Sequence, residues 1–143
     1  DSSIVPRIAL AKIYSKEPRV QIDRAPTKFH KFRFGKVLIG TTHGDTAKDG
    51  DLGMIMATDW KEDWGACDYF HWYKGHVHHD SLKEHHGGVI VETFRTLAPR
   101  DAWHSAQGYR SGRDIKADVW HIEDGHEQRY IVGIKKVKRL AET

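Results

Sequence analysis

An α/β fold is the class that this sequence predicts, with α+β as the alternative, and three observations indicate it. Short apolar runs of strand length alternate with segments whose apolar residues recur at helical spacing. Two of the apolar runs end in polar loops that contain histidine, which is where sheets of this class place their ligands. No apolar run approaches the length of a membrane span, and 143 residues suffice for one domain with a buried core.

The first half of the chain is expected to form a helix followed by three strands. Apolar residues at near-helical spacing predict a helix over residues 3–16. Alternation of polar and apolar residues predicts a short strand over 19–23 and a half-buried strand over 29–34. The apolar run at 36–40 is typical of a strand covered on both faces, and it leads into a polar loop over 41–45.

The second half is expected to contain one longer helix and several extended segments. Apolar residues between 52 and 64 follow the spacing of an amphipathic helix, which Gly65 would close. A short helix is expected over 99–104, and the charged tail over 135–139 reads as a solvated end. The other extended segments are expected at 69–73, 81–86, 89–92, 117–122 and 128–134, the last two forming a hairpin around Asp124-Gly125.

The most informative motif is Gly75-His76-Val77-His78-His79, taken together with His43-Gly44-Asp45. A His-x-His pair on an extended segment points both imidazoles to one side, so the rings can close on one metal ion or on two neighbouring ions. With 11 histidines and one cysteine, a metal site here would use nitrogen and oxygen ligands, which favours Mn, Fe, Zn or Ni in a catalytic role. If the two strands are neighbours, their loops converge. The alternative is a set of polar strand-end histidines that bind no metal.

Charge and cysteine content bear on partners and compartment. The net charge of +3 and the pI near 9.0 tolerate phosphate-rich partners without requiring them. Arg95 and Arg113 are candidate substrate-binding residues, because guanidinium groups match phosphate oxygens, and salt bridges or solvation are the alternative. The single Cys67 cannot form an internal disulfide, which fits an intracellular, cytoplasmic setting without a membrane partner.

The order strand, His-Gly, helix, strand, Gly-His-x-His resembles the calcineurin-like metallophosphoesterases, and more closely their phage-encoded members related to DNA-repair nucleases. His43-Gly44 and Gly75-His76-Val77-His78 carry the resemblance, which spans residues 1–135. The stretches 94–104 and 108–114 are also similar to the phage proteins. The resemblance implies the C-terminal half of a four-layer αββα sandwich, in which a mixed sheet is flanked by helices.

The resemblance also implies a centre of two divalent metal ions that activates a hydroxide for attack on phosphorus. His43 and His76 would bind one metal and His78 the other, with Mn the expected metal and Fe, Zn or Ni the alternatives. The substrate would be a phosphoester, with nucleic acid among the candidates.

The sequence departs from the family pattern at its beginning. The Asp-x-His, Gly-Asp and Gly-Asn-His motifs of the family are absent and would lie upstream of residue 1. We therefore expect the N-terminal half of the same protein, or another copy in a homo-oligomer, to supply the missing ligands, and this chain alone to be inactive. A sheet without its partner would expose an apolar face and an open edge, so the isolated chain is expected to dimerise, swap or aggregate.

Three functional hypotheses follow. The first is a metal-dependent phosphoesterase of the phosphodiesterase or nuclease type. The second is a non-catalytic module that binds a metal or nucleic acid through the same histidines. The third is a structural or interaction subunit of a phage system, in which the histidines have no special role.

Overall fold

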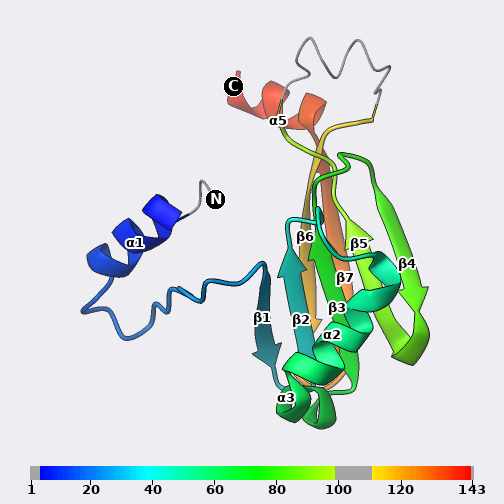
Figure 1. Cartoon of the computed structure of the whole chain (residues 1–143). Coiled ribbons are helices and arrows are strands. Elements are labelled where there is room, and N and C mark those ends of the chain that lie inside the picture. The colour runs from blue at the N-terminus through cyan, green and yellow to red at the C-terminus, as the bar shows by residue number, and fades with distance from the viewer. Residues whose placement is uncertain (1–3, 99–110, 143) are drawn as a thin grey trace. The chain divides into compact units, whose positions relative to one another are not determined.

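The computed structural model describes residues 4–98 and 111–142. It divides into a unit of residues 1–30 and a unit of residues 31–143. The class is mixed α/β, as predicted, with a five-stranded sheet, a separate two-stranded sheet and several helices (Figure 1). The helix predicted over 99–104 lies outside the described residues.

The first unit contains α1 (Ile4–Ile13) and an irregular segment that follows it. The predicted helix over 3–16 is confirmed, although it ends at Ile13, and none of its described residues is buried. The strand predicted over 19–23 is wrong, because this segment is irregular. Its Asp23 instead pairs with His30 at 2.6 Å, and a strand this short needs a hydrogen-bonded neighbour to form.

The second unit is built on a five-stranded sheet with the order β1-β2-β3-β5-β4 (Figure 1). β2 and β3 run parallel, β3 and β5 run parallel, and β4 is antiparallel to β5. All five strands coincide with segments that the sequence predicts to be extended. Their bounds are β1 (Phe29–Phe34), β2 (Val37–Thr42), β3 (Tyr69–Lys74), β4 (Ser81–His85) and β5 (Val89–Thr93).

Two helices, α2 (Leu52–Asp59) and α3 (Lys61–Ala66), cover one face of this sheet (Figure 1). The sequence predicts one helix here, and that prediction is wrong in one respect. The backbone leaves helical geometry at Trp60, where φ is −124° and ψ is 45°, so the segment is two helices and Gly65 lies inside the second. The Trp60 ring stacks on Trp72 with ring centroids 5.3 Å apart, which is a tertiary contact that helical spacing does not reveal.

The core lies between these helices and the sheet. The Trp72 indole donates a hydrogen bond to the Leu52 carbonyl at 3.1 Å, and Trp64 stacks on Phe70 at 4.0 Å. Two short 3-10 turns, Asp49–Asp51 and His86–Gly88, flank the packed region. The fully buried apolar side chains are Val37, Leu38, Leu52, Met56, Trp72, Val89 and Val91.

The hairpin of β6 (Asp114–His121) and β7 (Gly125–Gly133) lies against the opposite face of the sheet (Figure 1). The predicted hairpin is confirmed, with both strands beginning earlier than the sequence suggests. Its inner face contacts the sheet through polar groups, among them a 2.7 Å hydrogen bond from the Tyr73 hydroxyl to Asp118.

The tail expected as a solvated end is a helix, α5 (Ile134–Ala141). Its Lys135, Lys136, Lys138 and Arg139 are exposed, as expected for a charged segment. Within the described residues, no helix has the length and apolar character needed to cross a membrane.

Candidate histidine site

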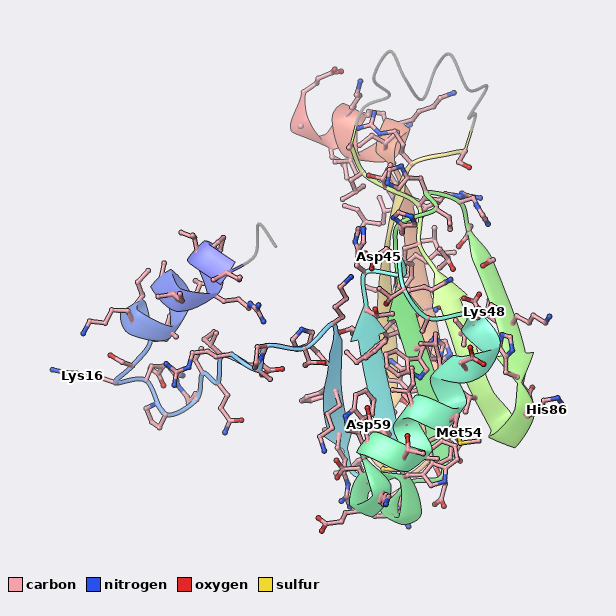
Figure 2. All side chains as sticks on the ribbon, viewed as in Figure 1. Lys16, Asp45, Lys48, Met54, Asp59 and His86 are labelled. Atoms are coloured by element: carbon pink, nitrogen blue, oxygen red, sulfur yellow. The ribbon has the colours of Figure 1, made fainter. Side chains whose placement is uncertain are left out.

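The two histidine motifs lie side by side because the strands that precede them are neighbours. In the parallel pairing of β2 with β3, Thr42 is opposite Lys74, so both strands end at the same edge of the sheet. His43 follows the first strand and Gly75-His76 follows the second. The convergence that the sequence left conditional is therefore confirmed. Figure 2 shows Asp45 in the same loop, close to the end of β2.

The imidazoles of His43 and His76 face each other. Nε2 of His43 lies 3.2 Å from Nδ1 of His76, and the rings meet edge to face with centroids 5.1 Å apart. Two nitrogens bound to one tetrahedral ion, each about 2.0–2.1 Å from it, would be about 3.3 Å apart. The observed separation therefore fits two ligands of one metal ion. It fits equally well a hydrogen bond between two neutral rings in opposite protonation roles.

The second loop has an unusual backbone. His76 and His78 have φ values of 68° and 55°, a region that side chains other than glycine seldom adopt. The Gly75 amide donates a hydrogen bond to the His43 carbonyl at 3.2 Å, which holds the two loops together. Gly44 has φ of 98°, and a Cβ there would lie 3.2 Å from the Gly75 carbonyl oxygen. Such conformations persist where the surroundings enforce them, and they concentrate at ligand sites.

A pocket of 320 Å³ opens beside the paired histidines. His78 lines this pocket together with His43 and His76, so the structure brings the three predicted metal ligands to one place. No acidic side chain of the described residues lines it. The other lining residues are Thr42, Tyr73, Lys74, Gly75, Phe94, Arg95 and Thr96.

The two cationic side chains of the pocket are each held by a carboxylate. Arg95 Nη1 donates to Asp114 Oδ2 at 2.6 Å, and Lys74 Nζ pairs with Asp49. Arg95 Nε is buried without a hydrogen-bond partner, and so is the Thr42 hydroxyl. A buried donor without a partner costs free energy, so both groups have hydrogen-bonding capacity that the described residues do not use.

The predicted substrate-binding arginines differ in position. Arg95 lines the histidine pocket. Arg113 does not, and its guanidinium donates to the Leu97 carbonyl, with Nε at 2.9 Å. This hydrogen bond to a backbone carbonyl differs from the salt bridge or solvation given as the alternative for Arg113.

The metal centre expected from the sequence stays a prediction. Across residues 4–98 and 111–142, no group of three or more His, Cys, Asp or Glu side chains is arranged to hold a metal ion. His43 and His76 supply two nitrogens at a suitable separation, whereas the carboxylates that bridge and neutralise two divalent ions are not part of this pocket.

A buried network of charges next to the site escaped the sequence reasoning. Glu92 of β5 is fully buried and accepts hydrogen bonds from Lys116 at 2.9 Å and from Arg129 at 2.8 Å. Arg129 also bonds Asp118 at 2.6 Å. The sequence does show charged residues at alternate positions of β6. Such alternation normally indicates a face exposed to solvent, so it does not by itself predict a buried network.

The electrostatics of this network follow from burial and pairing. Burial alone would raise the pKa of Glu92, but the contacts with His71, Arg129 and Lys116 outweigh it and lower the pKa to about 2. The same competition lowers the pKa of Asp118, where bonds from Arg129 and Tyr73 exceed the effect of burial. Burial and the Asp118 carboxylate both raise the pKa of Tyr73. The network therefore stays charged at neutral pH, and Tyr73 stays protonated.

Comparison with known proteins identifies no family for this chain. No model of a protein family matches the sequence, and a search of curated proteins returned no match either.

Proposed function

We propose that this chain contributes histidine ligands to a metal-dependent phosphoesterase of the phosphodiesterase or nuclease type. The observation that carries the proposal is the 3.2 Å approach of His43 Nε2 to His76 Nδ1 at the ends of two adjacent parallel strands. The resemblance to phage-encoded calcineurin-like metallophosphoesterases also supports the proposal. By that resemblance, His43 and His76 would share one ion and His78 would bind the other. Manganese is the first candidate metal, with iron, zinc and nickel as alternatives.

The residues of the chain have separate roles in this proposal. Bound divalent ions would supply an activated hydroxide and neutralise charge on the phosphate. The facing imidazoles hold the metal, and the strained loop at His76 and His78 fixes their orientation. Arg95 lines the pocket and donates to a phosphate oxygen, as expected for a guanidinium fork. The substrate is a phosphoester, and nucleic acid is one candidate.

In this proposal, the metal ligands that the chain does not supply come from another polypeptide segment. They are carboxylates from an N-terminal half of the same protein or from a second copy. Two features of the second unit support a covering partner in a four-layer sandwich: Phe32 of β1 is 61% exposed, and the outer hairpin face exposes Ile115 and Val119. Exposed apolar side chains that gather on one face mark surfaces where a partner can pack.

A second candidate function has its own support. The pocket has no acidic lining residue among those described, so the same histidines could serve a non-catalytic module that binds a metal or nucleic acid. Metal content alone does not separate this module from an enzyme part, whereas turnover does.

The test measures metal and turnover on the same preparation. Chelated protein is reloaded with Mn²⁺, analysed for bound metal, and assayed with bis(p-nitrophenyl) phosphate. We expect near-stoichiometric metal in the wild type and loss of metal in His76→Ala/His78→Ala. The matched control is His121→Ala, which removes an exposed histidine paired with Asp124 and should leave the metal content unchanged.

Each outcome has a definite meaning. Metal without turnover supports a part that needs carboxylates from elsewhere, and adding the complementary half should then restore hydrolysis. Metal with turnover shows that the chain completes its own centre. A wild type that binds no metal, or a His121→Ala variant that loses as much as the double variant, overturns the proposal.

A further inference from the structure

The histidine pocket has the features of an anion site in its own right. Its charged lining residues are Lys74 and Arg95, and none of the described lining residues is acidic. Hard divalent cations such as Mg²⁺ and Ca²⁺ take oxygen ligands, carboxylates among them, and this pocket lining offers no carboxylate. Cations and hydroxyl donors instead match the oxygens of a phosphate or sulfate group.

The guanidinium of Arg95 is held in a fixed orientation from one side. Asp114 of β6 accepts from Nη1 at 2.6 Å, and the second terminal nitrogen lies 3.8 Å from Asp80, which is beyond hydrogen-bonding distance. Arg95 is about one-third exposed, at 34%. One side of the guanidinium is thus anchored to a carboxylate that is 9% exposed, while the side chain remains accessible to the pocket.

Two donors at this place have no partner among the described residues. Thr42 Oγ1 and Arg95 Nε are buried, line the same pocket and make no hydrogen bond. One unpaired buried donor would be an isolated cost, whereas two in one pocket wall give the pocket two donors for the same acceptor group. A tetrahedral oxyanion offers several acceptor oxygens to such a set after small side-chain rotations.

We propose that Arg95 and Thr42, with Lys74 behind them, form a phosphate-binding subsite that takes a tetrahedral oxyanion without any metal. The ligand class is inorganic phosphate or the phosphoryl group of a phosphate ester. Asp114 acts as a positioning residue, because it holds the guanidinium at the pocket wall. This subsite rests on the proposed function, because it names the residues of the same pocket that recognise the phosphate group of the substrate. Binding of phosphate to the subsite does not depend on a bound metal.

The test uses the full chain after chelation and removal of the chelator. Inorganic phosphate is titrated calorimetrically in buffer at physiological chloride concentration, so that weak surface binding is suppressed. We expect saturable one-to-one binding. Arg95→Gln should weaken it about tenfold or more, because it removes a charge-assisted donor pair. Arg95→Lys should fall between, since lysine keeps the charge and loses the fork.

A second variant guards against misfolding of the first. Thr42→Val keeps the shape of a side chain whose hydroxyl has no partner, so the fold should tolerate it. It should weaken phosphate binding about three- to tenfold, the usual effect of one hydrogen bond.

The control is Arg33→Gln, which removes one positive charge at a carboxylate-paired arginine outside the pocket. It should change the affinity by less than about twofold, since exposed distant charges are screened. The proposal is overturned by the absence of saturable binding to the wild type, by equal losses in Arg33→Gln and Arg95→Gln, or by full affinity in both Arg95→Gln and Thr42→Val. The metal measurement is separate, so failure of this subsite and failure of the metal centre are distinguishable.

Discussion

Individual residues set the spacing between the layers of the second unit. Gly40 is opposite Trp72 in the register of β2 and β3, and the indole ring occupies the space beside it. A Cβ at Gly40 would lie 2.6 Å from the ring, closer than real contacts allow. The absence of a side chain at Gly40 is therefore what lets Trp72 reach the Leu52 carbonyl and close the core.

Gly40→Ala is expected to lower the free energy of unfolding by about 1–3 kcal/mol, because the extra carbon forces the indole and the helix above it to shift. Urea unfolding followed by tryptophan fluorescence measures the change. Gly65→Ala is the matched control. Among the described residues, and apart from the neighbouring residues and the backbone of its own helix, no heavy atom lies within 4 Å of the added carbon. Alanine also favours the helix, so stability should rise by up to about 1 kcal/mol. Equal stability of the two variants would contradict this account of Gly40.

At the scale of elements, the β6–β7 hairpin reverses the usual arrangement of an antiparallel pair. Asp118 and Lys116 point toward the five-stranded sheet, with side chains 9% and 6% exposed. Ile115 and Val119 alternate with them and are 44% and 39% exposed. Antiparallel strands with one solvated face normally place the apolar residues inside, so the inner face of this hairpin is stabilised by ion pairs and hydrogen bonds.

We expect Val119→Thr to change the free energy of unfolding by less than about 0.5 kcal/mol, because the side chain is on the exposed face and threonine keeps strand propensity. Light scattering at rising protein concentration should show less self-association than in the wild type. Asp118→Ala, in contrast, leaves Arg129 without one of its buried partners and should cost about 3 kcal/mol. A large loss of stability in Val119→Thr would show that the outer face is packed within this chain.

At the scale of the whole second unit, stability is linked to pH through Glu92. The pKa of this carboxyl is about 2 in the folded chain, against an ordinary value of 4.5. Between these values the unfolded chain binds more protons than the folded chain, so the stabilisation by Glu92 is complete above 4.5 and is lost as the pH falls toward 2.

Unfolding curves over an acidic pH series test this link. The wild type should be more stable than Glu92→Gln by about 3 kcal/mol at neutral pH, because the variant leaves Lys116 and Arg129 without their buried carboxylate. The difference should narrow as the pH falls from 4.5 toward 2, because Glu92 takes up a proton in the unfolded wild type while the folded chain still holds the carboxylate ionised. Glu127→Gln is the matched control, because it removes an exposed carboxylate from β7. It shows the effect of losing one negative charge without losing a buried contact. A constant difference at every pH would contradict the linkage.

Local patterns predicted most of the regular elements. The apolar run before Thr41 and the aromatic run from Tyr69 both form strands, and each strand contains buried residues. Alternation of polar and apolar residues wrongly predicted a strand over residues 19–23, because this segment has no neighbouring strand to pair with. Helical spacing missed the interruption at Trp60, because stacking on Trp72 is a contact between segments distant in sequence.

The candidate site was partly predictable for the same reason. Histidine loops at strand ends indicated His43, His76 and His78, and the structure places all three at one pocket. Thr42 and Lys74, the last residues of their strands, line it too. Their position next to the histidine motifs could have predicted that Thr42 and Lys74 line the pocket, whereas their residue types alone could not.

The sequence by itself determined the class of fold, the strands of the main sheet and the two loops that hold the histidines, because propensity and periodicity act between near neighbours. Only the tertiary structure decided that β2 lies beside β3, that Arg95 reaches the pocket while Arg113 does not, and that the hairpin turns its charged face inward. Strand order and the pairing of distant charges depend on contacts between segments far apart in the chain. No local pattern encodes these contacts, so they become visible only when the sheets are assembled.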